Sequence, residues 1–283
     1  MKTNSIYVGC TGFNYNSWKS KFGGFYPPRI DNKHLLDFYV TLFSCCEINS
    51  TFYNIPKLET TQRWAKSLPK EFVITAKLPK IISQAENLAA TENELLFFLN
   101  AMEPLRKNLG PFILQCHPNF DKNNFSFQHL EEFLDFFPLD KFELAVELRH
   151  TSWYEEDTFD LLNNKNVGIV SSYLPYLQFN LFEEVKKEYC YIRLIGSHNQ
   201  EIELGKEGVN REEHYIEIIS RFNELMRNKK KFGAFVMVNN HYSGYAPPIA
   251  KKIIEKFIEF GYEPVKPLVT AYKGQSNLSD FFS

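Results

Sequence analysis

The sequence has no apolar run long enough to cross a membrane, because no stretch approaches the roughly 20 consecutive apolar residues that a spanning helix needs. Its first residues, MKTNSIYVGC, also lack the basic segment, apolar run and small-residue cleavage site of a secretory signal. We therefore expect a cytoplasmic protein that makes no contact with a membrane.

Cysteine is scarce, and no C-x-x-C pair occurs. The count is odd, and most of the cysteines lie inside apolar runs, as reduced core thiols do. Structural thiols are therefore favoured over redox or zinc roles. The five are Cys10, Cys45, Cys46, Cys116 and Cys190.

Positive charge is not in excess, since 32 Lys and Arg face 34 Asp and Glu for a formal net charge of −2. Proteins that bind nucleic acid through nonspecific phosphate contacts are usually basic overall. Any contact with DNA or RNA must then be made by a small part of the surface or be assisted by a partner. The one basic run, residues 229–231, is best interpreted as solvated lysines after a helix.

No glycine-rich phosphate loop follows the first predicted strand, which removes the main reason to expect an open dinucleotide-binding sheet. Instead, eight short β-rich apolar runs alternate with helical patterns. This order predicts an α/β fold, a single (β/α)₈ TIM-type barrel, in preference to an open doubly wound sheet. The predicted strands are 6–10, 45–49, 72–78, 112–117, 143–149, 167–173, 189–196 and 232–240.

Three predicted helices have recognisable starts, in which a capping side chain precedes an acidic residue by three positions. These starts are at Thr91, Ser152 and Asn210. The sixth βα unit is weak, because Pro175 interrupts a short periodic stretch. We expect a loop or a short helix there.

Polar residues gather at the predicted carboxyl ends of the strands, where the chemistry of such barrels takes place. Side chains alternate across a strand, so Glu47 and Asn49 share one face, as do Glu147 and Arg149. Buried charges need partners, which predicts one compensated cluster. The candidate catalytic residues are Glu47, Glu147 and Lys77, and the candidate substrate-binding residues are Asn49, Gln115, Arg149, Arg193 and Asn239.

The cluster has two interpretations. In the functional one, the cations Lys77, Arg149 and Arg193 bind a phosphate or carboxylate, while Glu47 or Glu147 acts as a general acid or base. In the structural one, the same charges plug the top of the barrel. The sequence leaves both open.

A metal site is not indicated by ligand spacing, because no H-E-x-x-H or comparable motif occurs. Convergence of Glu47, His117, Glu147 and Asn239 on a divalent ion stays an alternative. The sequence identifies no cofactor.

The first loop is rich in aromatic residues and glycine, with GFNYNSW at 12–18 and FGGFYPP at 22–28. Such a loop could wall a pocket and stack on a planar ring, or it could be a packed lid. The residues alone do not decide between the two.

Several long segments in order resemble the DUF72 (YecE-like) family to about residue 260: YVGCTGFNYNSW with FYPP, EINSTFYNIP, FVITAKLP, LGPFILQCHPNF, AVELRHTSW, YIRLIG and VNNHYSGYAP. The resemblance implies a TIM-type barrel and carries no established reaction. One departure is GCTGF, where the family pattern leads us to expect G-x-S-G-W, so that Phe13 stands in place of a tryptophan.

The tail after residue 260 contains a predicted linker and a short peptide motif. Gly261, Pro264 and Pro267 predict an extended linker over 261–274 that follows the barrel of 1–260. Residues 275–283 begin with QSNLSDFF, which resembles the PCNA-interacting peptide (PIP box) of clamp partners. One 3₁₀ turn would bring its apolar side chains together as a plug. The predicted clamp-binding residues are Gln275, Leu278, Phe281 and Phe282; the alternative is a segment that folds back onto the barrel.

Three functions follow as hypotheses. The first is an enzyme, of hydrolase or nuclease type, that acts on a phosphate-bearing substrate such as nucleic acid and is recruited by the PCNA sliding clamp in DNA replication or repair. The second is a non-enzymatic clamp-binding accessory or competitor. The third is a small-molecule enzyme on an anionic metabolite.

Overall fold

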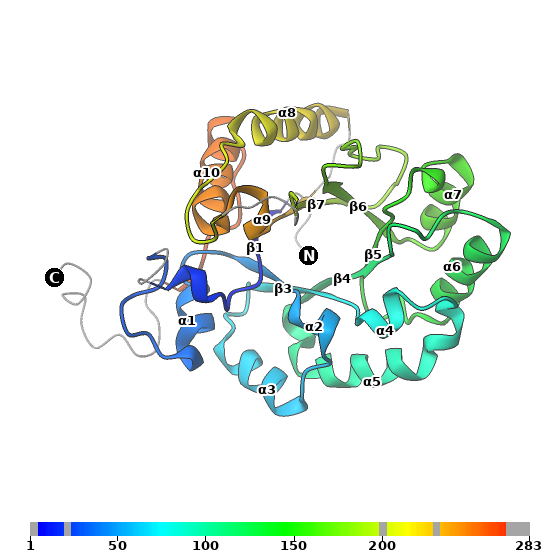
Figure 1. Ribbon diagram of the computed structural model, residues 1–283, viewed down its shortest axis with the longest axis horizontal. Coiled ribbons are helices and arrows are strands. Elements are labelled where there is room, and N and C mark those ends of the chain that lie inside the picture. The colour runs from blue at the N-terminus through cyan, green and yellow to red at the C-terminus, as the bar shows by residue number, and fades with distance from the viewer. Residues whose placement is uncertain (1–4, 20–23, 198–202, 229–232, 270–283) are drawn as a thin grey trace.

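Eight parallel strands close into one barrel in the computed structural model, which describes residues 5–19, 24–197, 203–228 and 233–269. Each strand pairs with the next along the chain, and β8 pairs with β1 (Figure 1). The predicted (β/α)₈ barrel is confirmed. The strands are β1 (Ile6–Thr11), β2 (Cys45–Ile48), β3 (Val73–Lys77), β4 (Leu109–Gln115), β5 (Leu144–Glu147), β6 (Gly168–Tyr173), β7 (Tyr189–Leu194) and β8 (Gly233–Val238).

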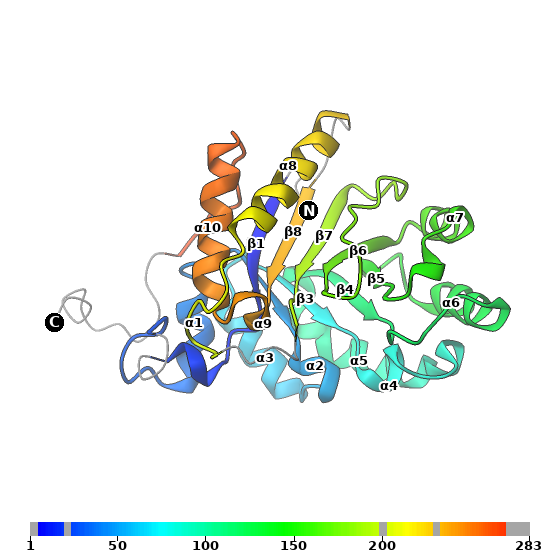
Figure 2. The same ribbon diagram turned by 45° about the horizontal axis from the view of Figure 1, so that its top comes forward.

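Helices surround the strands (Figure 1), and the short helices α2, α4 and α9 lie at the end toward which the strands point (Figure 2). The α-helices are α1 (Leu35–Tyr39), α2 (Ser50–Tyr53), α3 (Leu58–Ser67), α4 (Lys80–Ser83), α5 (Glu92–Met102), α6 (Asn124–Phe136), α7 (Glu156–Asn164), α8 (Glu212–Asn228), α9 (Asn240–Ser243) and α10 (Ala246–Glu259). The 3₁₀ turns are η1 (Asn16–Trp18), η2 (Asn32–His34), η3 (Leu88–Thr91), η4 (Glu103–Asn108) and η5 (Thr151–Trp153).

The barrel interior changes from apolar to polar along the strands. Tyr7 stacks on Phe235 near the amino-terminal end, with ring centroids 5.1 Å apart. One layer further, the Tyr191 hydroxyl and Thr75 Oγ1 lie 2.6 Å apart. Because side chains alternate in and out, the inward positions of the next layer are those of the predicted polar cluster. The apolar lower layers therefore form a closed floor beneath it.

The predicted helix starts have different outcomes. Asn210 caps α8, since its Oδ1 accepts a hydrogen bond from the Glu212 amide at 2.9 Å. Thr91 stands before α5 but makes no capping bond, because its hydroxyl donates to the Leu88 carbonyl. Ser152 lies inside η5, and Glu155 is the residue before α7. The segment between β6 and β7 is a loop. A loop was one of the two structures expected there, the other being a short helix.

The aromatic first loop is a packed lid in its second half. Trp18 is fully buried, and its indole Nε1 donates to Asn240 Oδ1 at 2.8 Å, which joins the loop after β1 to α9. Tyr26 is buried beside it and donates through its hydroxyl to the Phe13 carbonyl. Gly12 has a φ of 103°, where a side chain would also meet the Tyr15 ring.

The segment after α10 returns to the amino-terminal end of the barrel. The Val265 amide donates to the Ile6 carbonyl at 2.8 Å, next to a bridge between Ile6 and Pro264. Lys266 and Leu268 then line a small hollow against the residues that precede β2 and β3. The domain boundaries stay predictions. Gln275, Leu278, Phe281 and Phe282 lie outside the described residues, as does the basic run 229–231.

All five cysteines are buried thiols, and burial raises the pKa of Cys46. None of the helices in the described ranges is long and apolar enough to span a membrane.

Gly9 and Gly110 are matched strand positions for a packing test. A Cβ on Gly9 would lie 2.2 Å from the Cys45 carbonyl oxygen, which belongs to the backbone of the neighbouring strand, whereas on Gly110 it would meet a Val73 methyl at 2.7 Å. A methyl group can rotate away and a paired carbonyl cannot. We expect Gly9→Ala to lower the free energy of unfolding by about 3 kcal/mol and Gly110→Ala by about 1 kcal/mol. Equal losses in urea titrations would contradict this packing.

Candidate functional site

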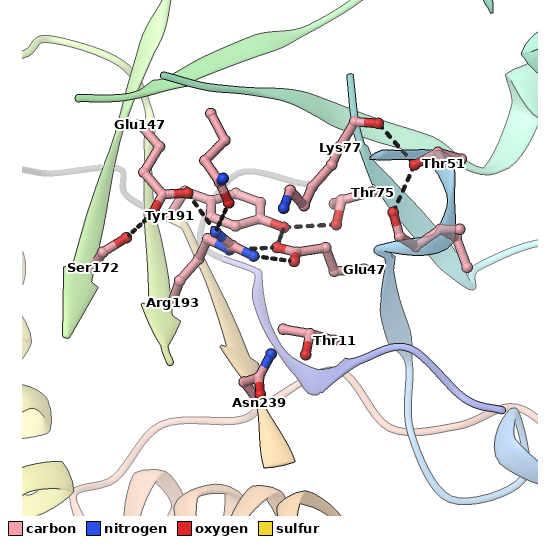
Figure 3. Close-up of polar contacts among 12 residues, drawn as sticks. Thr11, Glu47, Thr51, Thr75, Lys77, Glu147, Ser172, Tyr191, Arg193 and Asn239 are labelled. Carbon is pink, nitrogen blue, oxygen red and sulfur yellow. Dashed lines mark hydrogen bonds and ion pairs between the residues drawn. The ribbon is translucent and has the colours of Figure 1, made fainter. Parts of the chain in front are cut away.

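Arg193 joins two buried carboxylates at the carboxyl end of the barrel (Figure 3). Its Nε and Nη2 donate to the two oxygens of Glu47 at 3.0 and 2.7 Å, a bidentate pair. Its Nη1 donates to Glu147 Oε2. Bidentate guanidinium–carboxylate pairs are strong and geometrically specific. Residues from β2, β5 and β7 thus form one ion-pair network, as the strand-end pattern predicted.

A second arginine completes the network on the side of Glu147. Arg149 Nε donates to Glu147 Oε1 at 2.8 Å, and Ser172 Oγ donates to the same oxygen at 2.8 Å. Gln115 Oε1 accepts from Arg149 at 3.1 Å and from Arg193 at 3.2 Å. Each oxygen of Glu147 therefore has a donor, which is the condition for a charge to be stable in a buried place.

The network decides the ionisation of its members. Burial alone raises the pKa of the Glu147 carboxyl, but the charges of Arg149, Arg193 and Lys77 outweigh it and lower that pKa to about 2. Burial lowers the pKa of Arg193, and the two carboxylates more than offset this and raise it. Glu147 and Arg193 are therefore charged at neutral pH.

Tyr191 and Thr75 support Glu47 from below. The Tyr191 hydroxyl donates to Glu47 Oε2 at 2.9 Å and lies next to Thr75 Oγ1 (Figure 3). The strand-end pattern missed these two residues and Ser172. Tyr191 and Thr75 stand two positions before Arg193 and Lys77 on the same strands, so extending the alternation by one step would have found them.

Lys77 is the cation whose charge is not fixed. Its ammonium points into the cluster (Figure 3) but forms no hydrogen bond or ion pair with any described residue. It lies 3.8 Å from the centre of the Phe52 ring. Burial is the main cause that lowers the pKa of Lys77 to about 7; Arg193 acts in the same direction, and Glu147 and Glu47 oppose it. This amine can gain or lose a proton at neutral pH.

The cations lie nearer the solvent than the carboxylates. Glu47 and Glu147 are 0% exposed and Arg193 is 2% exposed, whereas Lys77 is 7% exposed and the Arg149 side chain 14%. A molecule that enters the mouth therefore meets Lys77 and Arg149 first. The carboxylates form a layer of negative charge beneath them.

Two of the predicted site residues lie apart from the network. Asn239 Oδ1 accepts from the His241 amide at 2.9 Å and so caps α9. Asn49 follows β2 and lines a neighbouring pocket. The convergence on a metal considered from the sequence does not occur, since His117 Nδ1 instead accepts from the Asn119 amide at 3.1 Å. In the described part of the chain, no three His, Cys, Asp or Glu side chains are grouped to hold a metal ion.

A cavity of about 370 Å³ adjoins the mouth, between the loop after β1 and the segment after β2. Phe13, Tyr15, Tyr53 and Trp64 are among its walls. The Phe13 ring meets Trp64 edge to face, with centroids 6.0 Å apart. The aromatic first loop therefore combines the two structures expected of it, because its second half is a lid and its first half walls this pocket.

The family model described as "Protein of unknown function DUF72" matches residues 7–268. The chain belongs to the DUF72 family. The predicted resemblance is thereby confirmed for the barrel, including the two loops that wall the pocket. The PIP-box assignment lies beyond the matched residues and stays a prediction.

Among DUF72-like proteins, UPF0759 protein YecE of Escherichia coli is 32% identical over 129 residues, a match that covers 44% of this chain and 46% of that protein. This match thus spans less than half of the curated relative. A DUF72 family protein of Thermotoga maritima has a crystal structure with 26% identity and a TM-score of 0.75, over 90% of this chain and 100% of that one. A DUF72 protein of Enterococcus faecalis, 21% identical over 90% of this chain and 98% of that one, shares the fold with a TM-score of 0.70.

Replacing Arg193 tests the network of this DUF72 barrel. Arg193→Met leaves two fully buried carboxylates without their shared cation, and breaking a buried ion pair in this way costs about 3–5 kcal/mol. We expect that loss in the free energy of unfolding, measured by urea titration. Arg63→Met is the matched control, because Arg63 is exposed on α3 and should change stability by about 0.5 kcal/mol or less. A similar small effect at Arg193 would show that the network does not hold the mouth together.

Proposed function

We propose that this DUF72 barrel is an enzyme that transfers protons on a phosphate-bearing substrate at its carboxyl-terminal mouth. The observation that carries the proposal is the layering of charge, with Lys77 and Arg149 toward the solvent and Glu47 and Glu147 buried below. An anionic group is the ligand that such a surface attracts.

Lys77 is the proton-transfer group in this proposal. An amine whose pKa is about 7 is half protonated near neutral pH, the condition under which general acid–base catalysis is most effective. In hydrolysis of a phosphate ester, water bonds to phosphorus and the bond to the leaving oxygen breaks. Protonated Lys77 gives its proton to that oxygen and regains one from the solvent, while the attacking water releases one.

The other predicted site residues have supporting parts. Arg149 binds the anion, because it is the more exposed of the two arginines. Arg193 supplies a fixed positive field. Glu47 and Glu147, predicted as catalytic, act by holding these arginines in place, and Gln115 fixes the spacing between them. Asn49 and Asn239 lie outside the ion-pair network, so their predicted contacts with the substrate stay predictions.

Sulfate is a direct probe of this proposal, because it stays doubly negative across the pH range in which Lys77 titrates. Since the pKa of Lys77 is lowered to about 7, its charge is present below that pH and lost above it. Calorimetric titration should show sulfate affinity falling by about tenfold between pH 6 and pH 8, an effect of about 1.4 kcal/mol. In Lys77→Met the affinity should lie below the wild-type value at pH 8, where a fraction of Lys77 is still protonated, and should no longer depend on pH.

Lys66→Met, an exposed lysine on α3, should bind sulfate as the wild type does. Purified protein should also convert nucleic acid or nucleotide substrates, and Lys77→Met should abolish that turnover. The proposal is wrong if sulfate binding is independent of pH in the wild type or survives intact in Lys77→Met.

The tail favours nucleic acid among the phosphate-bearing substrates. We propose that Gln275, Leu278, Phe281 and Phe282 bind the PCNA sliding clamp, on the strength of the Q-x-x-L-x-x-F-F spacing. Docking on the clamp raises the local concentration of the barrel at DNA, which offsets its lack of basic charge. A protein with this role works inside the cell on chromosomal DNA. Without turnover at the mouth, the same contact supports the non-enzymatic accessory role.

Removing residues 275–283 tests the clamp contact. Surface plasmon resonance with immobilised clamp should show binding by the intact chain and a loss of at least about a hundredfold in the shortened one. Phe281→Ala with Phe282→Ala should give most of that loss, because buried aromatic anchors dominate such interfaces. Ser283→Ala is the control and should bind normally. Equal binding by the intact and shortened chains would refute the assignment.

A further inference from the structure

The cavity beside the mouth has aromatic side chains in its walls. Phe13 and Trp64 stand nearly perpendicular, with an interplanar angle of 86°, so they present an edge and a face to the space between the loops. Tyr53 is 75% exposed although its ring is large and mostly apolar. The face of an aromatic side chain in a cavity wall can stack on a planar ring. Trp18 and Trp153 are fully buried, so Trp64 is the tryptophan available to a ligand.

Asn49 supplies an unused polar group in the same cavity. Its Oδ1 is shielded from solvent, and no described residue donates to it. A buried acceptor without a donor is unfavourable, and a ligand N–H would remove that cost. The amide also offers an N–H₂ group of its own. Asn49 therefore presents an acceptor and a donor side by side, the pair that recognises the edge of an adenine.

The cavity is neutral although the mouth next to it is charged. No lining residue carries a formal charge at neutral pH, because the Tyr15 hydroxyl donates to the Thr11 carbonyl and burial raises the pKa of Tyr15 to about 12. A ring with one polar edge suits these walls. A sugar suits them less well, because hydroxyl groups all round its rim each need a partner.

A short structural path connects the cavity to the cations of the mouth. The Tyr53 ring, in the cavity wall, meets Phe52 edge to face with centroids 5.3 Å apart, and the Lys77 ammonium lies over the other ring of that pair. Thr51 Oγ1 also donates to the Lys77 carbonyl at 2.7 Å. Residues 51–53 thus hold the cavity and Lys77 in a fixed relation.

From these contacts we propose that the cavity binds the nucleobase, preferably a purine, of a substrate whose phosphate lies on Lys77 and Arg149. The inference deepens the proposed function and rests on it for the phosphate half. The base stacks on the face of Trp64, Phe13 packs against the rim of the base, and the Asn49 amide forms hydrogen bonds with its polar atoms. The substrate class is then a nucleotide or a nucleotide within a nucleic acid.

Three probes separate the halves of the ligand: adenosine 5′-monophosphate, ribose 5-phosphate without a base, and adenosine without a phosphate. Calorimetric titration should give at least tenfold tighter binding of the monophosphate nucleotide than of ribose 5-phosphate. Trp64→Leu should remove that difference and leave ribose 5-phosphate binding unchanged. Asn49→Ala, a second variant in case Trp64→Leu does not fold, should weaken only the two base-containing probes, by about fivefold.

The matched control is Phe125→Leu, an aromatic residue that is 75% exposed on α6 and should alter none of the three affinities. Wild-type tryptophan fluorescence should be quenched by adenosine 5′-monophosphate and not by ribose 5-phosphate, and the quenching should disappear in Trp64→Leu.

The outcomes distinguish the two proposals. Equal affinity for the nucleotide and for ribose 5-phosphate, with both lost in Lys77→Met, overturns the base pocket and leaves the phosphate site. Adenosine binding that needs Trp64, without any binding of ribose 5-phosphate, overturns the phosphate site and leaves the base pocket. Ribose 5-phosphate binding that needs Trp64 assigns the cavity to a sugar and overturns the inference. No binding of any probe overturns both.

Discussion

The mouth of this barrel depends on one guanidinium group shared by two carboxylates. Glu47 and Glu147 come from strands on different sides of the barrel, and both are 0% exposed and paired with Arg193, which lies between them. Arg193 donates hydrogen bonds to both carboxylates and to Gln115. The charges of Arg193, Glu47 and Glu147 are therefore compensated within the network. The group left with a variable charge is Lys77, whose pKa is lowered to about 7 mainly by burial and also by Arg193.

Two neighbouring environments of opposite character follow from this arrangement. The strand ends supply charge, and the loops after β1 and β2 supply a neutral aromatic space beside it. A rigid element joins them, because the residues of α2 contact both the cavity and Lys77.

Much of this was predictable from sequence, because strand period and barrel topology are local signals. Alternation along β2 and β5 was enough to place Glu47 and Glu147 inside the mouth. Alternation does not indicate which cation lies between the two carboxylates. Arg193 comes from β7, and its distance from Glu47 and Glu147 depends on how the barrel closes. The pocket was harder still, because Trp64 reaches Phe13 from a helix about fifty residues away in the chain. Capping signals misplaced the start of α7, since the hydroxyl of Ser152 accepts from the Lys122 amide in a different loop.

The hydrogen bond from Val265 to Ile6 ties the end of the described chain to the amino-terminal rim of β1, the rim opposite Lys77 and Arg149. Residues 266–268 continue along that rim beside the starts of β2 and β3. The carboxyl end of the described chain and the charged mouth therefore lie at opposite rims, separated by the full height of the barrel.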